Sequence, residues 1–265
     1  MTRISIAAFL LSLTAQAQAS LGLSPMRLGL PLQPGEVHSG ALDLSSAAAA
    51  AVRVRGELLD FYIDESMTPQ FVRNRPQEAA HSCRGWLIVN PMEAELAPQE
   101  HQLVRYTLRV PAGTAPGSYY CAAGFTALPS AEQLRQTGLR ATVRVVAVFY
   151  AVVGERKAEG EISGLRLERA AGPEERWVAV LTIRNSGGWH FRPQGEVQIQ
   201  GEGGKVLETL QVPSFPVLPR RQQQFVLPVT QAAPDAIRRL KAEVDIGAGE
   251  LQEAAIDVPT RTAAH

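Results

Sequence analysis

The stretch Val104-Arg105-Tyr106-Thr107-Leu108-Arg109-Val110 alternates apolar residues with polar or charged ones at every position. Successive side chains of a β-strand point to opposite faces of the sheet, so this period of two predicts a strand with one buried and one solvated face. The same alternation recurs at residues 52–58, 196–200 and 240–246. Because these segments lie in both halves of the chain, the pattern predicts strands throughout.

Turn signals separate the predicted strands. The 265 residues include 22 glycines and 18 prolines, and these residues cluster at Pro34-Gly35, Ala115-Pro116-Gly117 and Gly203-Gly204. Turns that recur about every 8 to 12 residues are typical of β-sandwiches. The predicted fold class is therefore all-β, with two Ig-like β-sandwich domains in tandem.

A boundary between the two domains is predicted after the apolar run at residues 143–153. That run gives way to the charged segment at residues 155–160, before a new apolar pattern starts at Ile162. We expect the first Ig-like domain to span residues 20–154 and the second to span residues 161–259. Both lengths are usual for a single Ig-like domain.

The N-terminus carries the features of a secretory signal peptide. Arg3 precedes a short apolar run at residues 4–13, and small residues with cleavage-site spacing follow up to Ala19. A run of about ten apolar residues is too short to span a membrane, which takes about 20. We therefore predict a signal peptide at residues 1–19 that is removed on export, and no membrane insertion after its cleavage.

The chain has two cysteines, Cys83 and Cys121. An even number of cysteines in an exported protein predicts a disulfide, because the compartments outside the cytoplasm are oxidising. A redox or metal site is the alternative, but neither cysteine has a second cysteine or a histidine at the spacing that such sites use. We predict a structural disulfide between Cys83 and Cys121.

Charge and motifs point away from several function classes. The chain carries 26 Lys and Arg against 26 Asp and Glu, so it lacks the excess positive charge that binding to nucleic acid requires. Its histidines are scattered at His38, His81, His101, His190 and His265, and none belongs to a metal-binding or nucleophile motif. We expect no catalytic residue, no metal and no cofactor, and a protein that is not an enzyme.

Several short motifs of the first half follow one another in a recognisable order. They are Ser24-Pro25-Met26-Arg27, Trp86-Leu87-Ile88-Val89-Asn90-Pro91, Gly117-Ser118-Tyr119-Tyr120-Cys121 and Val145-Val146-Ala147-Val148-Phe149-Tyr150. Together they resemble the N-terminal Ig-like domain of the periplasmic pilus-assembly chaperones, the PapD-like family, over residues 21–153. The second half resembles this family less and is similar to generic Ig-like or fibronectin-like modules of secreted bacterial proteins.

The resemblance implies a periplasmic chaperone that binds pilus or surface subunits by lending them the last strand of its first domain. Its implied partners are a pilin-like or surface subunit and an outer-membrane usher. The alternative is a structural or adhesive Ig-like module that stays in a secreted or cell-surface assembly. A chaperone is recovered free after assembly, whereas a structural module remains with the polymer.

The resemblance also implies a basic site for the terminal carboxylate of the subunit. In the family two basic residues hold this carboxylate, and Arg27 matches the first of them by position. The second is a lysine of the closing strand that has no counterpart here, since Val145 or Ala147 stands in its place. Arg144 is the approximate substitute. A guanidinium presents a planar fork of donors that matches the two oxygens of a carboxylate.

The closing strand itself is the candidate subunit-binding segment. Its residues Val143, Val145, Ala147 and Phe149 form one apolar stripe, and a second stripe, which includes Val146 and Val148, lies on the opposite face. Burial of one face leaves the other in need of cover. A partner strand would supply that cover by β-augmentation. The alternative is cover by the second domain or by the loop at residues 131–140.

Overall fold

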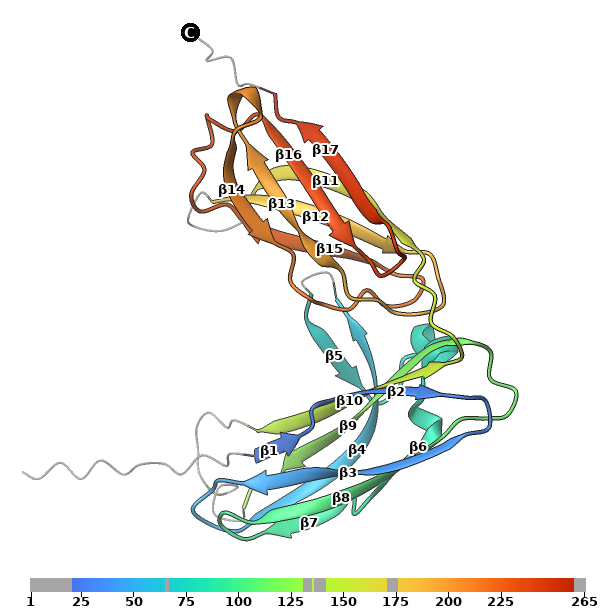
Figure 1. Ribbon diagram of the computed structural model, residues 1–265. Coiled ribbons are helices and arrows are strands. Elements are labelled where there is room, and N and C mark those ends of the chain that lie inside the picture. The colour runs from blue at the N-terminus through green and yellow to red at the C-terminus, as the bar shows by residue number, and fades with distance from the viewer. Residues whose placement is uncertain (1–20, 65–66, 131–134, 136–141, 171–175, 260–265) are drawn as a thin grey trace, which may run out of the picture.

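The computed structural model describes residues 21–64, 67–130, 135, 142–170 and 176–259. The chain forms two β-sandwiches, one from β1 to β10 and one from β11 to β17 (Figure 1). We call them the first and the second sandwich. The predicted all-β class with two Ig-like sandwiches is confirmed. The predicted signal peptide lies outside the described residues, as does most of the loop at residues 131–140.

The first sandwich consists of two sheets, with strand orders β1-β3-β8-β6 and β2-β10-β9-β4-β5, and β7 pairs with β4. Two 3-10 helices, η1 (Pro76–His81) and η2 (Arg84–Trp86), follow β5. The strands are β1 (Leu21–Ser24), β2 (Arg27–Leu32), β3 (Val37–Ser46), β4 (Val52–Ile63), β5 (Pro69–Val72), β6 (Leu87–Asn90), β7 (Glu93–Leu96), β8 (His101–Arg109), β9 (Gly117–Ala127) and β10 (Arg144–Val153).

The N-terminal segment contributes a strand to each sheet. β1 pairs antiparallel with β3, and after the cis peptide bond between Ser24 and Pro25 the chain enters the other sheet as β2. There β2 pairs parallel with β10, and Arg27 lies opposite Val148. This pairing places the first residue of β2 beside the middle of β10.

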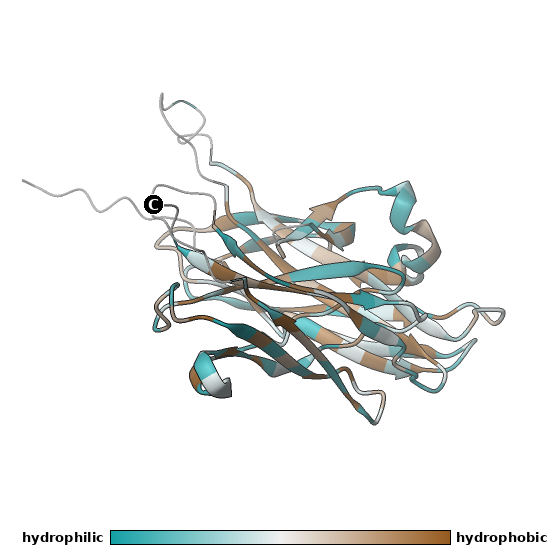
Figure 2. Ribbon diagram, turned by 90° about the horizontal axis from the view of Figure 1, so that it is seen from above, coloured by the Kyte–Doolittle hydropathy of each residue, from teal (hydrophilic) through white to brown (hydrophobic). Residues whose placement is uncertain are grey.

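The core of the first sandwich follows the sequence alternation. In β8 the side chains of Val104, Tyr106 and Leu108 are buried, whereas Arg105 is exposed. Hydrophobic and hydrophilic residues alternate along the strands in the same way in Figure 2. Burial of such side chains on the inner faces of both sheets is what holds the two sheets together.

The predicted disulfide is confirmed. Cys83 and Cys121 are bonded, with their Cα atoms 5.2 Å apart, and both residues are fully buried. Cys83 immediately precedes η2, and Cys121 lies in β9. The disulfide therefore fixes the segment of the two short helices against the second sheet.

The second sandwich packs a sheet of order β11-β12-β15 against one of order β14-β13-β16-β17. Its core contains Leu181, Phe191 and Phe225, all fully buried. A 3-10 helix, η3 (Glu202–Gly204), joins the hairpin of β13 and β14. The strands are β11 (Gly160–Arg169), β12 (Trp177–Asn185), β13 (Gln194–Gln200), β14 (Val206–Gln211), β15 (Gln222–Pro228), β16 (Arg239–Asp245) and β17 (Leu251–Asp257).

The two sandwiches contact each other beside the linker between β10 and β11. A small apolar cluster joins Tyr120 and Tyr150 of the first sandwich to Leu218 of the second. The N–H of Ser118 donates a hydrogen bond to the main-chain oxygen of Gly188 at 2.8 Å. This interface brings residues of both sandwiches close to β10.

Candidate functional site

One edge of β10 is only partly covered. The strand pairs with β9 along its whole length, but β2 covers its other side only from Val148 onward. Among the residues that the structure describes, none pairs with the segment 144–147 on that side. The N–H of Val148 donates to the oxygen of Met26 at 2.9 Å, so the N–H and C=O groups of Arg144 and Val146 face the same way. We call this segment the open edge of β10.

The predicted stripe of β10 faces the core of the first sandwich. Ala147 and Phe149 are fully buried there, while Val143 and Val145 are half-buried and pack against it. The side chains of Ala147 and Phe149 thus pack inward in the free protein, and their contact with a subunit stays a prediction. Both stripes of this strand are apolar, so alternation alone does not identify the inner one.

The opposite stripe of β10 is covered over part of its length. Tyr150 is buried against the second sandwich, where its ring centroid lies 4.6 Å from that of His190. Val146 and Val148 remain half-buried. Cover by the second domain, one of the alternatives considered above, therefore applies at Tyr150.

Arg144, the predicted substitute for the missing lysine, forms an ion pair with Glu57. Its Nη1 donates to Oε1 of Glu57 at 3.1 Å, and Nε of Arg73 donates to Oε2 of the same carboxylate at 3.0 Å. Burial raises the pKa of Glu57, but the two arginines outweigh burial and lower it. Arg144 also lies four residues from Val148, about 13 Å along the strand. It is thus neutralised and distant from Arg27.

Two arginines that sequence reasoning missed stand near Arg27. Arg156 lies in the linker and Arg192 follows β12. The positive charges of both, together with that of Arg27, act electrostatically on the buried ring of His190. Burial, and then the positive charges of these arginines, lower the pKa of His190 to about 3. We call Arg27, Arg156 and Arg192 the arginine cluster. No local motif marks it, because the packing of the two sandwiches creates it.

Contacts with the second sandwich position two members of the cluster. Nη2 of Arg156 donates to the main-chain oxygen of His190 at 3.0 Å, and Nη1 of Arg192 donates to that of Ser214 at 3.0 Å. The guanidinium carbon of Arg192 lies 5.8 Å from the ring centroid of Tyr150. Arg27 is exposed at the start of β2.

The arginine cluster carries uncompensated positive charge. Burial lowers the pKa of Arg192, the neighbouring Tyr150 raises it, and Arg27 and Arg156 lower it further. Within the described part of the chain, no carboxylate forms an ion pair with any of these three arginines. Guanidinium groups that act on one another without an acidic partner favour an anion, and a carboxylate fits their planar donors.

The described residues show neither a metal-binding cluster nor a membrane-spanning helix. They contain no group of three or more His, Cys, Asp or Glu side chains placed to bind a metal ion. None of their helices has the length and apolar character needed to cross a membrane.

Comparison with known proteins finds likeness only among solved structures. No family model and no curated protein matches the chain. A chain of a chaperone–tip adhesin complex of CFA/I fimbriae biogenesis is 13% identical, with a TM-score of 0.48, and the match covers 91% of this chain and 100% of that one. A chain of the CsuC–CsuE chaperone–tip complex of Acinetobacter baumannii is 12% identical, with a TM-score of 0.47 and coverage of 90% and 98%.

A third structure, a complex of Salmonella enterica SafA pilin with the SafB chaperone, is similar to the same degree. The identity is 12%, the TM-score is 0.46, and the match covers 91% of this chain and 99% of that one.

Proposed function

We propose that the chain is a periplasmic chaperone that binds a pilus or surface subunit during assembly. The subunit's last strand pairs with the open edge of β10, and its terminal carboxylate binds to the arginine cluster. The observation that carries this proposal is continuity: the open edge ends at Val148, and Arg27 lies directly opposite Val148. The open edge, which can bind a strand, and the arginine cluster, which can bind an anion, are thus adjacent at Val148.

The geometry of β2 indicates the direction of the bound strand. β2 runs parallel to β10 and begins at Arg27. A partner strand could continue the line of β2 beyond its N-terminal end and run in the same direction as β2. Such a strand would pass along residues 144–147 and end beside Arg27. Its carboxyl end would then reach the arginine cluster, whereas an antiparallel strand would bring its amino end there. The site therefore favours a parallel strand with a free C-terminus.

The chemistry of both parts suits such a ligand. Main-chain groups of Arg144 and Val146 supply hydrogen bonds that do not depend on sequence, as in other complexes formed by β-augmentation. The half-buried side chains of Val145, Val146 and Val148 offer apolar contact to alternate side chains of the bound strand. The arginine cluster adds charged hydrogen bonds to the terminal carboxylate.

Several further properties belong to the same proposal. We take residues 20–154 and 161–259 as the two domains and residues 1–19 as an export signal. The protein then acts in the periplasm, without catalysis, and passes its subunit to an outer-membrane usher. Export also accounts for the buried disulfide, because an oxidising compartment is where such bonds persist.

Co-purification from the periplasm tests this proposal. Tagged wild-type protein should recover a single subunit in a one-to-one complex, identified by mass spectrometry. Arg192→Gln should recover much less of it. Arg109→Gln, which changes an exposed arginine of β8 in the sheet that does not contain β2 and β10, should recover as much as the wild type. Recovery within an intact polymer would instead favour the structural or adhesive module.

A further inference from the structure

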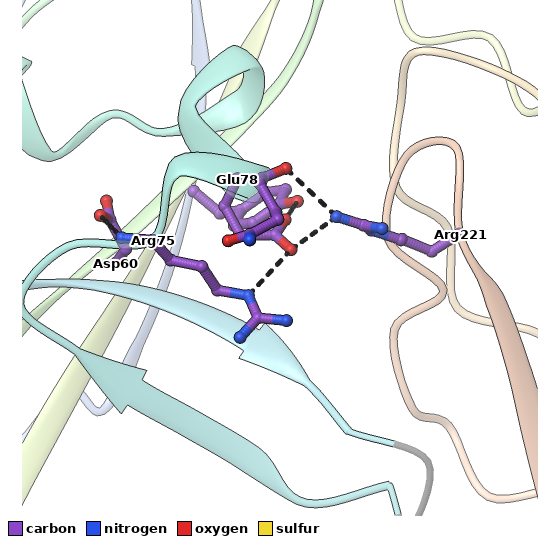
Figure 3. A network of polar contacts seen from close by, with 6 residues as sticks. Asp60, Arg75, Glu78 and Arg221 are labelled. Carbon is purple, nitrogen blue, oxygen red and sulfur yellow. Dashed lines mark hydrogen bonds and ion pairs between the residues drawn. The ribbon is translucent and has the colours of Figure 1, made fainter.

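A charged contact joins the two sandwiches at Glu78, a residue of η1 that is only 3% exposed (Figure 3). Its Oε1 accepts a hydrogen bond from Nη2 of Arg221 at 2.6 Å, and its Oε2 accepts one from the hydroxyl of Tyr120 at 2.7 Å. Nε of Arg75 lies 3.6 Å from Oε1. A buried carboxylate is costly unless it keeps its cation, so this contact ties Arg221 of the second sandwich to the first.

On the first sandwich, Glu78 stands in a fixed relation to Arg27. Tyr120, which donates to Glu78, lies in β9 opposite Tyr150 of β10. Tyr150 pairs in turn with Gly29 of β2, the strand that Arg27 begins. The disulfide holds the segment that follows η1 against β9. Glu78 and Arg27 therefore belong to one rigid unit.

On the second sandwich, Arg221 stands in a fixed relation to Arg192. The main-chain oxygen of Arg221 accepts a hydrogen bond from the N–H of Asn185 at 2.8 Å. The side chain of Asn185 donates to the main-chain oxygens of Trp189 at 2.8 Å and Val217 at 2.9 Å. These bonds connect the loop that carries Arg221 with the loop that carries Arg192. The two arginines thus move together.

We propose that Glu78 and Arg221 are positioning residues, which hold the second sandwich where Arg192 faces Arg27. This inference rests on the proposed function, because the spacing of the two arginines matters only if the cluster binds a carboxylate. The three guanidinium groups of the cluster repel one another, and the attraction between Glu78 and Arg221 opposes that repulsion. Without it, the sandwiches turn about the linker and the cluster spreads apart.

A distance measurement tests the positioning role without any ligand. Ala41→Cys in β3 and Thr209→Cys in β14 place spin labels at exposed positions, one on each sandwich. Arg221→Met should lengthen or broaden the distribution of distances between the labels, and Arg221→Lys should restore most of it. Arg220→Met, at the exposed neighbour, is the matched control and should leave it unchanged. An unchanged distribution in a folded Arg221→Met variant would overturn the proposal.

Binding measurements then show whether this position acts through Arg192. The probe is a peptide of about eight residues that alternates valine and threonine and ends in a free carboxylate. As a single substitution, Arg221→Met should weaken binding of this peptide by about tenfold. Added to Arg192→Gln, it should weaken binding hardly at all. Equal losses in both backgrounds would contradict the inference.

Failure of the inference differs from failure of the proposed function. If the wild type binds the carboxylate peptide no better than its amide, the proposed function fails, and the label distances alone decide the positioning role. Arg221 is 47% exposed at its side chain, so Arg221→Met should fold. A single cooperative unfolding transition of the variant, monitored by circular dichroism, checks this directly.

Discussion

Arg192→Gln should weaken binding of a strand that ends in a free carboxylate and leave binding of the amidated strand almost unchanged. The substitution keeps a polar side chain at the half-buried position but removes the charge and most of the donors. A hydrogen bond between charged groups contributes about 1.5 to 3 kcal/mol. The expected loss of affinity is therefore between about tenfold and a hundredfold.

The size of the effect should differ within the cluster. Arg27 is exposed, so water competes for its hydrogen bonds, and Arg27→Gln should cost less affinity than Arg192→Gln. In the free protein the arginines repel one another, so neither substitution should lower the free energy of unfolding by more than about 0.5 kcal/mol. Loss of affinity without loss of stability distinguishes a ligand-binding role from a structural one.

Isothermal titration calorimetry with a matched pair of peptides measures this effect. The two peptides share one alternating valine and threonine sequence and differ only in a terminal carboxylate or amide. The wild type should favour the carboxylate, and Arg192→Gln should remove most of the preference. If Arg192→Gln lowers both affinities equally, or neither, then the carboxylate does not bind at the arginine cluster.

Three further predictions concern the edge strand, a buried carboxylate and the disulfide. Val146→Pro removes an N–H that faces the open edge, so it should abolish binding while the protein stays folded, whereas Val145→Pro removes an N–H of the β9 ladder and should destabilise the fold in urea unfolding. Burial raises the pKa of Glu208, but hydrogen bonds from the turn at residues 230–232 outweigh burial and lower it. The ionised Glu208 therefore stabilises the fold fully above its unfolded-state pKa near 4.5, and this stabilisation is lost as the pH falls through the lower folded-state pKa. Glu208→Gln should lower the free energy of unfolding by about 2 kcal/mol at neutral pH and by less in acid. The control Glu202→Gln, at an exposed position, should leave it unchanged. Replacement of both cysteines with alanine should cost about 4 kcal/mol in urea unfolding, the chain-entropy value for a separation of 38 residues, and an unchanged midpoint would contradict this.

The fold could be predicted because its signals are local. Alternation in the segment 104–110 depends only on the geometry of one strand, and the structure buries Val104, Tyr106 and Leu108 as that pattern requires. The disulfide could equally be predicted, because two cysteines leave only one pairing. Neither inference needed knowledge of which segments meet in space.

The site could be predicted only in part, because it depends on packing. Both stripes of β10 are apolar, and only the structure shows that Ala147 and Phe149 face inward. The sequence does not give the distance between Arg144 and Arg27, because the pairing of β2 with β10 sets that distance. The contact between the two sandwiches brings Arg192 toward Arg27, and no spacing in the sequence encodes that contact.

Hydrogen exchange of the amides of β10, measured residue by residue by NMR in the free protein and in its complex with the co-purified subunit, shows where on the chain the subunit's strand binds. We expect the amides of Arg144 and Val146 to exchange rapidly in the free protein and to become protected in the complex. The amides from Val148 onward that already pair with β2 should change little. Protection elsewhere on the surface, with Arg144 and Val146 still exchanging rapidly in the complex, would contradict the claim that the subunit's strand binds at the open edge.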